Sequence, residues 1–406
     1  MLQKLSGLLK QLLKPARIAK LVGAVVGLLL IVLVIWMAIA GPVTVYRILR
    51  YGDTDIDDFS HYPGRRLQAT TSPFRFELDV NALQVPASVL RDFGADGQLE
   101  EILRSNDSIA FLVIKNDTIL YERYFQGHTA AARSQSFSMA KSYTSALIGM
   151  AIDDGYLEGV DQRVTQYVPE LADRGFGEVT IEHLLTMMSG SNYVEDDNPF
   201  AEHVILNYTP ALEQEILKIA METEPGTRFR YKSGDNALLA LVLDRALGEE
   251  TITGYTQRRF WNPLGMEQDG VWTIDHEGDG LEKTWCCLAA SARDFAKLGR
   301  LYLRQGEWNG QQLLSPDWIQ RSTQAGAVPE EEWPDDFRVA GFHNYGYQWW
   351  LGSREESDYL ALGKDGQFLY VNPLRDVVIV RLGWSSGALR AGQWLSLFQT
   401  LAREAG

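Results

Sequence analysis

The sequence predicts an α+β fold, in which a mostly antiparallel sheet packs against a helical region behind one N-terminal transmembrane helix. Strand-like runs occur near both ends of the long C-terminal part, and short helical patterns lie between them. The N-terminal apolar run contains no charged residue. The 406 residues suffice for a large core, and 46% of them are apolar, as in folded proteins. We divide the chain into a cytoplasmic basic segment (1–20), a membrane anchor (21–40), a tether (41–82) and a folded domain (83–406).

The N-terminal segment predicts a membrane anchor. Residues 21–40, "LVGAVVGLLLIVLVIWMAIA", are uncharged and long enough, at about 1.5 Å per residue, to cross a hydrocarbon core of about 30 Å. Basic residues precede this run, which places the N-terminus in the cytoplasm and the large C-terminal part in the periplasm or outside the cell: Lys4, Lys10, Lys14, Arg17 and Lys20. The alternative is a signal peptide cleaved after Ala40, since Ala38-Ile39-Ala40 has the small-x-small form. Under either interpretation, the C-terminal part is exported from the cytoplasm.

Composition argues against several classes of partner. The net charge is −15, and an acidic chain is a poor ligand for nucleic acid. The two cysteines, Cys286 and Cys287, are adjacent, which suits neither a disulfide framework nor a zinc site, so we expect two small core residues. The six histidines show no metal-ligand spacing. We therefore predict no metal and no cofactor, and the sequence leaves the oligomeric state open.

The first elements after the anchor follow from turn residues and β-branched runs. Residues 51–82 are polar and rich in turn signals, as in a tether. The runs "SIAFLVI" and "TILYERYF", separated by Lys115-Asn116-Asp117, predict a β-hairpin. A helix is expected from Ser138 to Ile152, ending at Asp153-Asp154-Gly155.

The rest of the chain returns from helices to strands. Residues 180–299 mix short helical patterns with loops, and four later runs are strand-like: "YGYQWWLG", "DYLALG", "QFLYV" and "VVIVRLG". A final helix is expected over about 388–404. We expect the first and last strands of the chain to pair in one sheet.

The start of the helix at Ser138 could carry chemistry. Ser138 and Lys141 are three residues apart, so that on a helix the hydroxyl and the amine lie on one face. Lysine can take the proton of a serine only if its pKa falls from about 10.4 towards neutrality. The alternative is that Ser138 is a helix N-cap and Lys141 a solvated residue of the first turn.

A second serine motif lies near the C-terminus. Gly383-Trp384-Ser385-Ser386-Gly387 fits the Gly-x-Ser-x-Gly nucleophile elbow and lies between a predicted strand and a predicted helix. In that fold an acid and then a histidine follow the serine, but no histidine follows Gly387. We therefore interpret this motif as a strand-to-helix turn with a serine near the helix N-cap.

Two further segments complete the first motif. In "EPGTRFRYKSGDNALLAL", Tyr231 and Ser233 stand in a turn before an apolar helix, and in "ALGKDGQFLYVNP" the triplet Lys364-Asp365-Gly366 stands at the start of a strand. Here the chain resembles the serine hydrolases that include class C β-lactamases, D-alanyl-D-alanine carboxypeptidases and esterases. It is most similar to their 6-aminohexanoate-dimer hydrolase branch. That family carries Ser-x-x-Lys, Tyr-x-Asn or Tyr-x-Ser, and Lys-x-Gly in this order, and the resemblance covers about residues 102–401.

The resemblance implies a β-lactamase-like fold and an acyl-enzyme mechanism. Ser138 would attack the carbonyl, Lys141 and Tyr231 would carry the protons, and no metal would be needed. Lys364 would add a second cation that helps keep Lys141 neutral or Tyr231 acidic. The backbone N–H groups of Ser138 and Gln367 would form the oxyanion hole, each worth about 3 kcal/mol. The resemblance also places substrate-binding side chains, with aromatic residues that could line an acyl pocket: Ser233, Asp365, Gly366, Tyr193, Tyr345, Trp349 and Trp350.

Two departures from the β-lactamase pattern bear on the substrate. Ser233 replaces the usual asparagine, so a peptide or β-lactam side-chain amide loses a partner. Asp365 replaces the usual threonine and would repel the carboxylate of such substrates. We therefore expect hydrolysis of a small ester or linear amide. The alternatives are a penicillin-binding D-alanyl-D-alanine carboxypeptidase or β-lactamase, and a catalytically silent protein that binds cell-envelope ligands.

Overall fold

The computed structural model describes residues 15–94, 97–324, 328 and 333–406, and Lys4, Lys10 and Lys14 of the predicted basic segment lie outside them. The chain forms two compact units. The N-terminal unit comprises Met1–Asp53 and Asp196–Pro210, and the main unit comprises Thr54–Glu195 and Ala211–Gly406.

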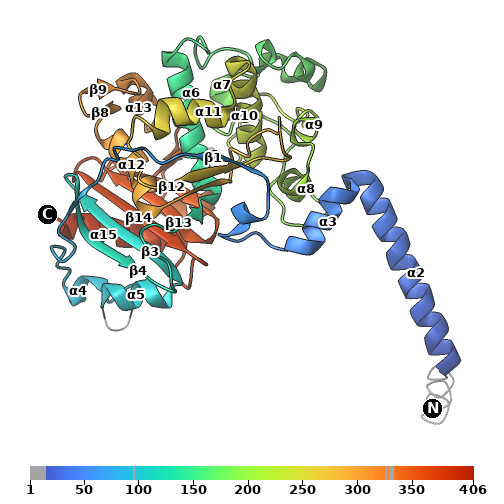
Figure 1. Cartoon of the computed structure of the whole chain (residues 1–406), viewed down its shortest axis with the longest axis horizontal. Coiled ribbons are helices and arrows are strands. Elements are labelled where there is room, and N and C mark those ends of the chain that lie inside the picture. The colour runs from blue at the N-terminus through green and yellow to red at the C-terminus, as the bar shows by residue number, and fades with distance from the viewer. Residues whose placement is uncertain (1–14, 95–96, 325–327, 329–332) are drawn as a thin grey trace. The chain divides into compact units, whose positions relative to one another are not determined.

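An eight-stranded sheet in the order β10-β11-β12-β13-β14-β3-β4-β2 forms the centre of the main unit (Figure 1). Its strands are β2 (Glu77–Leu78), β3 (Ser108–Lys115), β4 (Thr118–Tyr124), β10 (Asn344–Tyr345), β11 (Trp350–Leu351), β12 (Tyr359–Gly363), β13 (Gln367–Asn372) and β14 (Val377–Gly383). β2 joins β4 in parallel, and the other neighbours pair antiparallel. β14 pairs with β3, with Val380 opposite Leu112, so the predicted hairpin and the predicted pairing of early and late strands are both confirmed.

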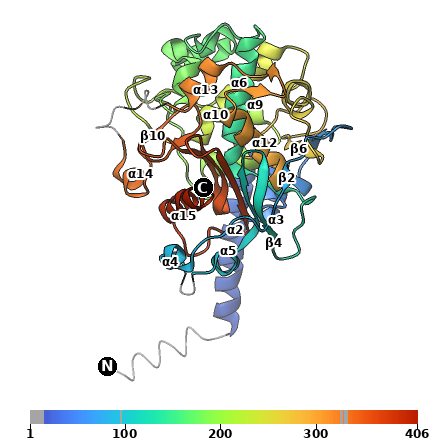
Figure 2. The same ribbon diagram turned by 90° about the vertical axis from the view of Figure 1, so that its left-hand side faces the viewer.

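Helices cover both faces of this sheet, which explains why β13 and β14 are buried along their whole length. α15 (Ala391–Glu404), α4 (Ala87–Leu90) and α5 (Leu99–Ser105) pack on one face, while α12 (Ala292–Leu303) packs on the other (Figures 1 and 2). Phe398 of α15 lies 5.4 Å from the Phe368 ring. Gly299 allows α12 to approach closely, since a Cβ there would lie 2.8 Å from Val378 Cγ1.

A helical region completes the main unit next to α12. Its helices are α6 (Ala140–Asp153), α7 (Ile181–Leu185), α9 (Leu212–Ile216), α10 (Ser233–Leu247), α11 (Ile252–Thr256) and α13 (Pro316–Ser322). Shorter pieces precede, connect or follow them in the chain: η1 (Asp58–Ser60), η3 (Val164–Gln166), η4 (Pro169–Arg174), η5 (Phe176–Glu178), η6 (Gln257–Trp261), β8 (Glu307–Trp308), β9 (Gln311–Gln312) and α14 (Asp335–Val339). Every residue of α6 from Ala140 to Ala151 is buried, as expected for a helix with apolar neighbours on all sides. α6 therefore gives its first turn a rigid support.

A second sheet, in the order β1-β6-β7-β5, was not predicted from the sequence. Its strands are β1 (Gly64–Leu67), β5 (Ser134–Gln135), β6 (Gly270–Thr273) and β7 (Leu288–Ala290), which are too short for a recognisable alternation. The stretch 41–82, expected to be a tether, supplies β1, and Ile56 and Leu67 in it are buried. From Thr54 onward this stretch is part of the main unit.

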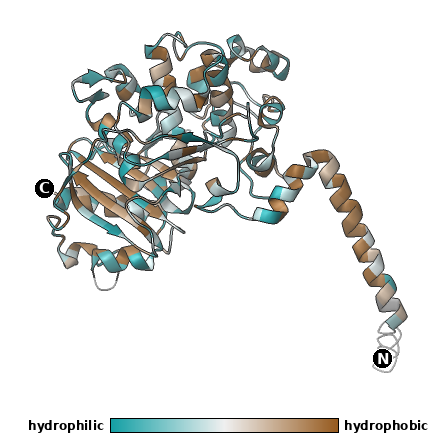
Figure 3. Ribbon diagram, in the orientation of Figure 1, coloured by the Kyte–Doolittle hydropathy of each residue, from teal (hydrophilic) through white to brown (hydrophobic). Residues whose placement is uncertain are grey.

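The N-terminal unit contains α2 (Pro15–Ala40), α3 (Pro42–Tyr51) and α8 (Glu202–Tyr208). Figure 3 shows α2 as apolar along most of its length. Residues 19–40 are long and apolar enough to cross a membrane, although a signal sequence near an N-terminus has the same properties. Pro42 begins α3 directly after Gly41, and Arg47 of α3 donates to the Tyr208 carbonyl of α8 at 3.1 Å.

Candidate active site

Ser138 and Lys141 meet at the start of α6. Ser138 lies in the 3₁₀ turn η2 (Phe137–Met139), and Lys141 lies in the first turn of the helix that follows. The Lys141 Nζ atom is 2.8 Å from Ser138 Oγ, and Lys141 is only 1% exposed. The alternative of a solvated lysine is therefore wrong.

Lys141 has partners that suit a neutral amine. Besides Ser138 Oγ, its Nζ lies 3.0 Å from Ser233 Oγ and 3.0 Å from the Trp285 carbonyl. An ammonium group must donate all three of its bonds, whereas a neutral amine can donate two and accept one. With the Trp285 carbonyl and Ser233 Oγ as acceptors, the lone pair of the neutral amine is left for the Ser138 proton.

Burial explains how Lys141 becomes neutral. Desolvation lowers the pKa of Lys141 to about 8, and the negative charge of Glu195 acts in the opposite direction. Lys364, which the sequence led us to expect as a repelling cation, is not among the causes of this pKa shift. Burial of Lys141 therefore lowers its pKa without the second cation that we expected at Lys364.

Tyr231 and Ser233 flank the start of α10, as predicted. The Tyr231 hydroxyl is hydrogen-bonded to Ser138, and the Tyr231 ring centroid is 5.0 Å from Lys141 Nζ. Burial raises the pKa of Tyr231 well above its ordinary value. The phenol is therefore neutral near pH 7 and can donate a proton. Of the two expected alternatives, a neutral Lys141 or an acidic Tyr231, the pKa shifts agree with the first.

Glu195 is a residue of this cluster that the sequence analysis missed. Its carboxylate accepts a hydrogen bond from the backbone N–H of Ser233, and its charge raises the pKa values of both Lys141 and Tyr231. In the sequence it stands in the acidic run "VEDD", which has the pattern of a solvated loop. No local signal distinguishes Glu195 from its acidic neighbours.

The third motif lies beside η2. Lys364-Asp365-Gly366 forms the turn η8 (Lys364–Gly366) between β12 and β13. A Cβ on Gly363, the residue before this turn, would lie 2.3 Å from the Ser136 carbonyl oxygen. Lys364 is exposed, and its Nζ donates to Thr54 Oγ1 at 3.0 Å, while Gln367 is fully buried at the start of β13. The fold therefore brings the third motif to the turn that carries Ser138.

Aromatic side chains surround Tyr231, but not all of those predicted. Trp350 stacks on the Tyr231 ring at 5.3 Å, and Tyr345 meets the same ring edge-on at 6.1 Å. Trp349 packs instead against core rings, 4.6 Å from Tyr302 and 5.2 Å from Tyr359. Consecutive side chains of an extended segment point to opposite sides, so only one of the two tryptophans can face Tyr231.

Tyr193 is the remaining predicted pocket residue. Its ring packs against the first turn of α10, where a Cβ on Gly234 would lie 2.6 Å from Tyr193 Cγ. Tyr193 is 1% exposed, so it supports the backbone next to Ser233.

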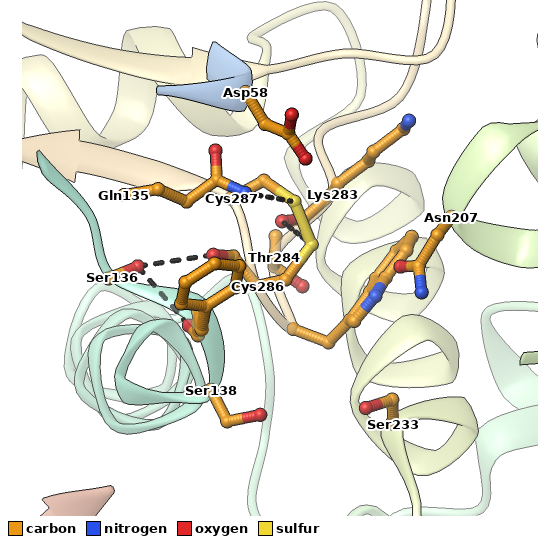
Figure 4. Close-up of a disulfide and its surroundings, with 12 residues drawn as sticks. Asp58, Gln135, Ser136, Ser138, Asn207, Ser233, Lys283, Thr284, Cys286 and Cys287 are labelled. Atoms are coloured by element: carbon orange, nitrogen blue, oxygen red, sulfur yellow. Dashed lines mark hydrogen bonds between the residues drawn. A yellow bond between two sulfur atoms is a disulfide. The ribbon is translucent and has the colours of Figure 1, made fainter. Parts of the chain in front are cut away.

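The two cysteines are bonded to each other, and our prediction of two separate core residues was wrong. The backbone N–H groups of Cys286 and Cys287 both donate to the Lys283 carbonyl, and this tight turn brings the adjacent side chains together. Figure 4 shows the disulfide beside Ser136, whose hydroxyl donates to the Cys286 carbonyl at 3.3 Å. The same turn presents the Trp285 carbonyl to Lys141.

The second serine motif is a strand-to-helix turn, as predicted. It connects β14 to α15, Ser385 Oγ donates to Asp107 Oδ2 at 2.6 Å, and the Gly387 N–H donates back to Ser385 Oγ at 3.0 Å. The N-cap position of α15 is occupied by Arg390, several residues after the serines. Ser385 is thus held by an aspartate and a turn amide.

Comparisons with known proteins identify relatives of this chain and solved structures with a similar fold. The chain is 28% identical over 332 residues to the 6-aminohexanoate-dimer hydrolase of Paenarthrobacter ureafaciens, covering 78% of this chain and 80% of that protein. A Bacillus anthracis structure provisionally named a 6-aminohexanoate-dimer hydrolase aligns with a TM-score of 0.67 and 24% identity, over 85% of this chain and 91% of the other. EstCE1, a hydrolase with promiscuous acyltransferase activity, aligns with a TM-score of 0.60 and 16% identity, over 78% of this chain and 99% of its own.

The family comparison covers all three motifs. Residues 98–393 match the family model described as Beta-lactamase, which is well over half of the chain. On this match, and with the fold and the Ser-Lys-Tyr cluster described above, the chain belongs to the beta-lactamase family.

Proposed function

We propose that this chain is a membrane-anchored serine hydrolase that cleaves a small ester or linear amide through an acyl-enzyme on Ser138. The observation that carries the proposal is the buried Lys141 Nζ at 2.8 Å from Ser138 Oγ, with its pKa lowered to about 8. A base with a pKa near the working pH is the requirement for activating a serine hydroxyl. Hydrolases of esters and amides occur among the relatives, which fits this chemistry.

Acylation begins at Ser138. Lys141 accepts the Ser138 proton as Oγ attacks the carbonyl carbon, and the resulting oxyanion accepts from the backbone N–H of Ser138. Its second donor is the backbone N–H of Gln367, which donates to the Lys364 carbonyl within η8 and has to turn from that carbonyl to the oxyanion. Tyr231, a neutral phenol hydrogen-bonded to Ser138, then gives its proton to the leaving alcohol or amine. The ammonium of Lys141 returns a proton to Tyr231.

Deacylation runs over the same groups in reverse. Water attacks the acyl carbon while Tyr231 takes one of its protons and passes its own proton to Lys141. The ammonium of Lys141 then returns that proton to Oγ as Ser138 leaves. Lys364 at the third motif supplies a positive charge near the oxyanion side, as the family pattern implies.

Substrate preference follows from two side chains. Ser233 Oγ is bonded to Lys141 at 3.0 Å, so it serves the base and offers no amide group to a peptide side chain. Asp365 adds a negative charge at the third motif, which disfavours substrates with a carboxylate there. These features favour a neutral ester or linear amide, as does the similarity to a 6-aminohexanoate-dimer hydrolase.

The test uses the full-length chain purified in detergent, with Ser138→Ala as the matched control. The wild type is expected to react with a fluorophosphonate probe and to hydrolyse p-nitrophenyl acyl esters or short linear amides faster than nitrocefin. Probe labelling that survives Ser138→Ala would remove Ser138 as the nucleophile. Stable acylation by a labelled penicillin would favour the carboxypeptidase or β-lactamase alternative. Ligand binding without turnover of any ester would favour a silent binding protein.

A further inference from the structure

Arg381 is a buried cation that the proposed reaction does not use directly. It stands on β14, its register partner on β13 is Phe368, and its exposed fraction is 0%. Its guanidinium carbon lies 4.4 Å from the ring centroid of Trp394, which covers it from α15. A charge this deep in the core needs compensation by hydrogen bonds.

The hydrogen bonds of Arg381 converge on the third motif. Its Nη1 donates to the Asp365 carbonyl at 3.1 Å and to the Gly366 carbonyl at 2.6 Å. The other three go to the Ser385 carbonyl at 2.8 Å, to Ser108 Oγ at 3.1 Å and to the Asn106 carbonyl. Four of the five acceptors are backbone carbonyls, so the guanidinium mainly holds main-chain segments in place.

The turn that Arg381 holds needs such support. Asp365 has φ 60 and ψ 20 and Gly366 has φ +74, so two consecutive residues adopt the left-handed conformation. A Cβ on Gly366 would lie 2.0 Å from Arg381 Nη1, which explains why glycine stands there. The guanidinium therefore fills the space beneath the turn and bonds both of its carbonyls.

Gln367 ties the same turn to the end of β14. Its Nε2 donates to the Gly383 carbonyl at 2.7 Å, and its Oε1 accepts from the Gly383 N–H at 3.0 Å. The backbone of Gln367 is thus fixed relative to the Gly383–Gly387 turn, whose Ser385 carbonyl Arg381 also binds.

We propose that Arg381 is a positioning residue, which holds Lys364 and the backbone N–H of Gln367 in place by binding the carbonyls of Asp365 and Gly366. This N–H is the proposed second oxyanion donor, and within η8 it donates to the Lys364 carbonyl. The inference rests on the proposed function for the roles of Lys364 and Gln367. It gives the Gly-x-Ser-x-Gly motif a structural purpose, because the Ser385 carbonyl helps to orient the guanidinium. Positioning of an oxyanion donor acts on the transition state more than on the bound substrate.

The test compares Arg381→Lys with Arg375→Lys in the full-length chain. Lysine keeps the charge at position 381 but lacks the planar fork that reaches both carbonyls and the Ser385 turn. Arg375 lies in the loop of the same β13–β14 hairpin, where its Nε donates to Glu356 at 2.9 Å away from the third motif. We expect Arg381→Lys to lower kcat for p-nitrophenyl esters about 10- to 100-fold with KM changed less than about threefold, and Arg375→Lys to keep both.

Three outcomes overturn the positioning role: an unchanged kcat in folded Arg381→Lys, a loss confined to KM, or an equal loss of kcat in Arg375→Lys. If Arg381→Lys does not fold, Ser108→Ala decides, since it removes only the acceptor of Nε. A several-fold fall in kcat at constant KM supports the proposal, and an unchanged kcat overturns it. Wild-type protein without turnover or probe labelling at Ser138 would instead refute the proposed function.

Discussion

At the scale of single residues, the surroundings of one amine determine the chemistry of this site. Lys141 has Ser138, Ser233 and the Trp285 carbonyl within hydrogen-bond distance, and burial lowers its pKa to about 8. Glu195, bonded to the N–H of Ser233, moderates that shift. A serine and a lysine three residues apart were visible in the sequence, but their burial and the nearby carboxylate were not.

The pH dependence of acylation follows from the pKa of Lys141. Only the neutral amine can accept the Ser138 proton, so kcat/KM should rise about tenfold per pH unit below pH 8 and level off above about pH 9. Tyr231 stays protonated across this range because burial raises its pKa. Stopped-flow measurement of p-nitrophenol release between pH 5.5 and 9.5 checks this, and a flat profile would contradict Lys141 as the base.

Glu195→Gln isolates the effect of the carboxylate charge. Glutamine keeps an oxygen that can accept from the Ser233 N–H but removes the charge that favours protonated Lys141. The midpoint of the pH profile should therefore move to lower pH. Glu182→Gln, which removes a carboxylate paired with Arg321 at the surface, is the matched control and should leave the midpoint unchanged.

At the scale of elements, short turns place the functional groups. The 3₁₀ turn before α6 carries Ser138, the first turn of α10 presents Ser233, and η8 carries Lys364. The turn at Cys286 and Cys287 supports the first of these, through the hydrogen bonds from Lys141 to the Trp285 carbonyl and from Ser136 to the Cys286 carbonyl.

The disulfide gives a direct chemical prediction. When the protein is unfolded without reductant, it should contain no thiol that reacts with a maleimide. Reduction should then expose the thiols of both Cys286 and Cys287. Because the two cysteines are adjacent, the bond closes almost no loop, and Cys286→Ser/Cys287→Ser should change the free energy of unfolding by less than about 1 kcal/mol. Alkylation with mass spectrometry and urea unfolding measure the two effects. Two reactive thiols in the unreduced protein would contradict the bond.

At the scale of the whole molecule, the N-terminal segment has the composition of a membrane span or a signal sequence. α2 is apolar over residues 19–40, and basic residues precede this run while acidic residues follow from Asp53. We propose an uncleaved anchor with the main unit on the outer side of the membrane.

Cell fractionation tests the anchor. The full-length chain should stay with membranes through carbonate extraction, and its main unit should be digested by protease added to spheroplasts. Lys4, Lys10 and Lys14 exchanged for glutamate should weaken this orientation. A mature chain that begins at Gly41 and is released in soluble form would show signal cleavage instead.

Local periodicity and spacing were enough to predict the α+β class, the pairing of early with late strands, and the order of the three motifs. The sequence also excluded the Ser385 motif, since no histidine follows it. The folded structure was needed to see that Trp350 and not Trp349 faces Tyr231 and that Glu195 joins the cluster. It was also needed to see that Cys286 bonds to Cys287 and that Arg381 lies beneath the third motif. Most of these are contacts between residues far apart in the chain, and all of them depend on which side chains the packing of sheets, helices and turns brings together. Local sequence patterns do not record that packing.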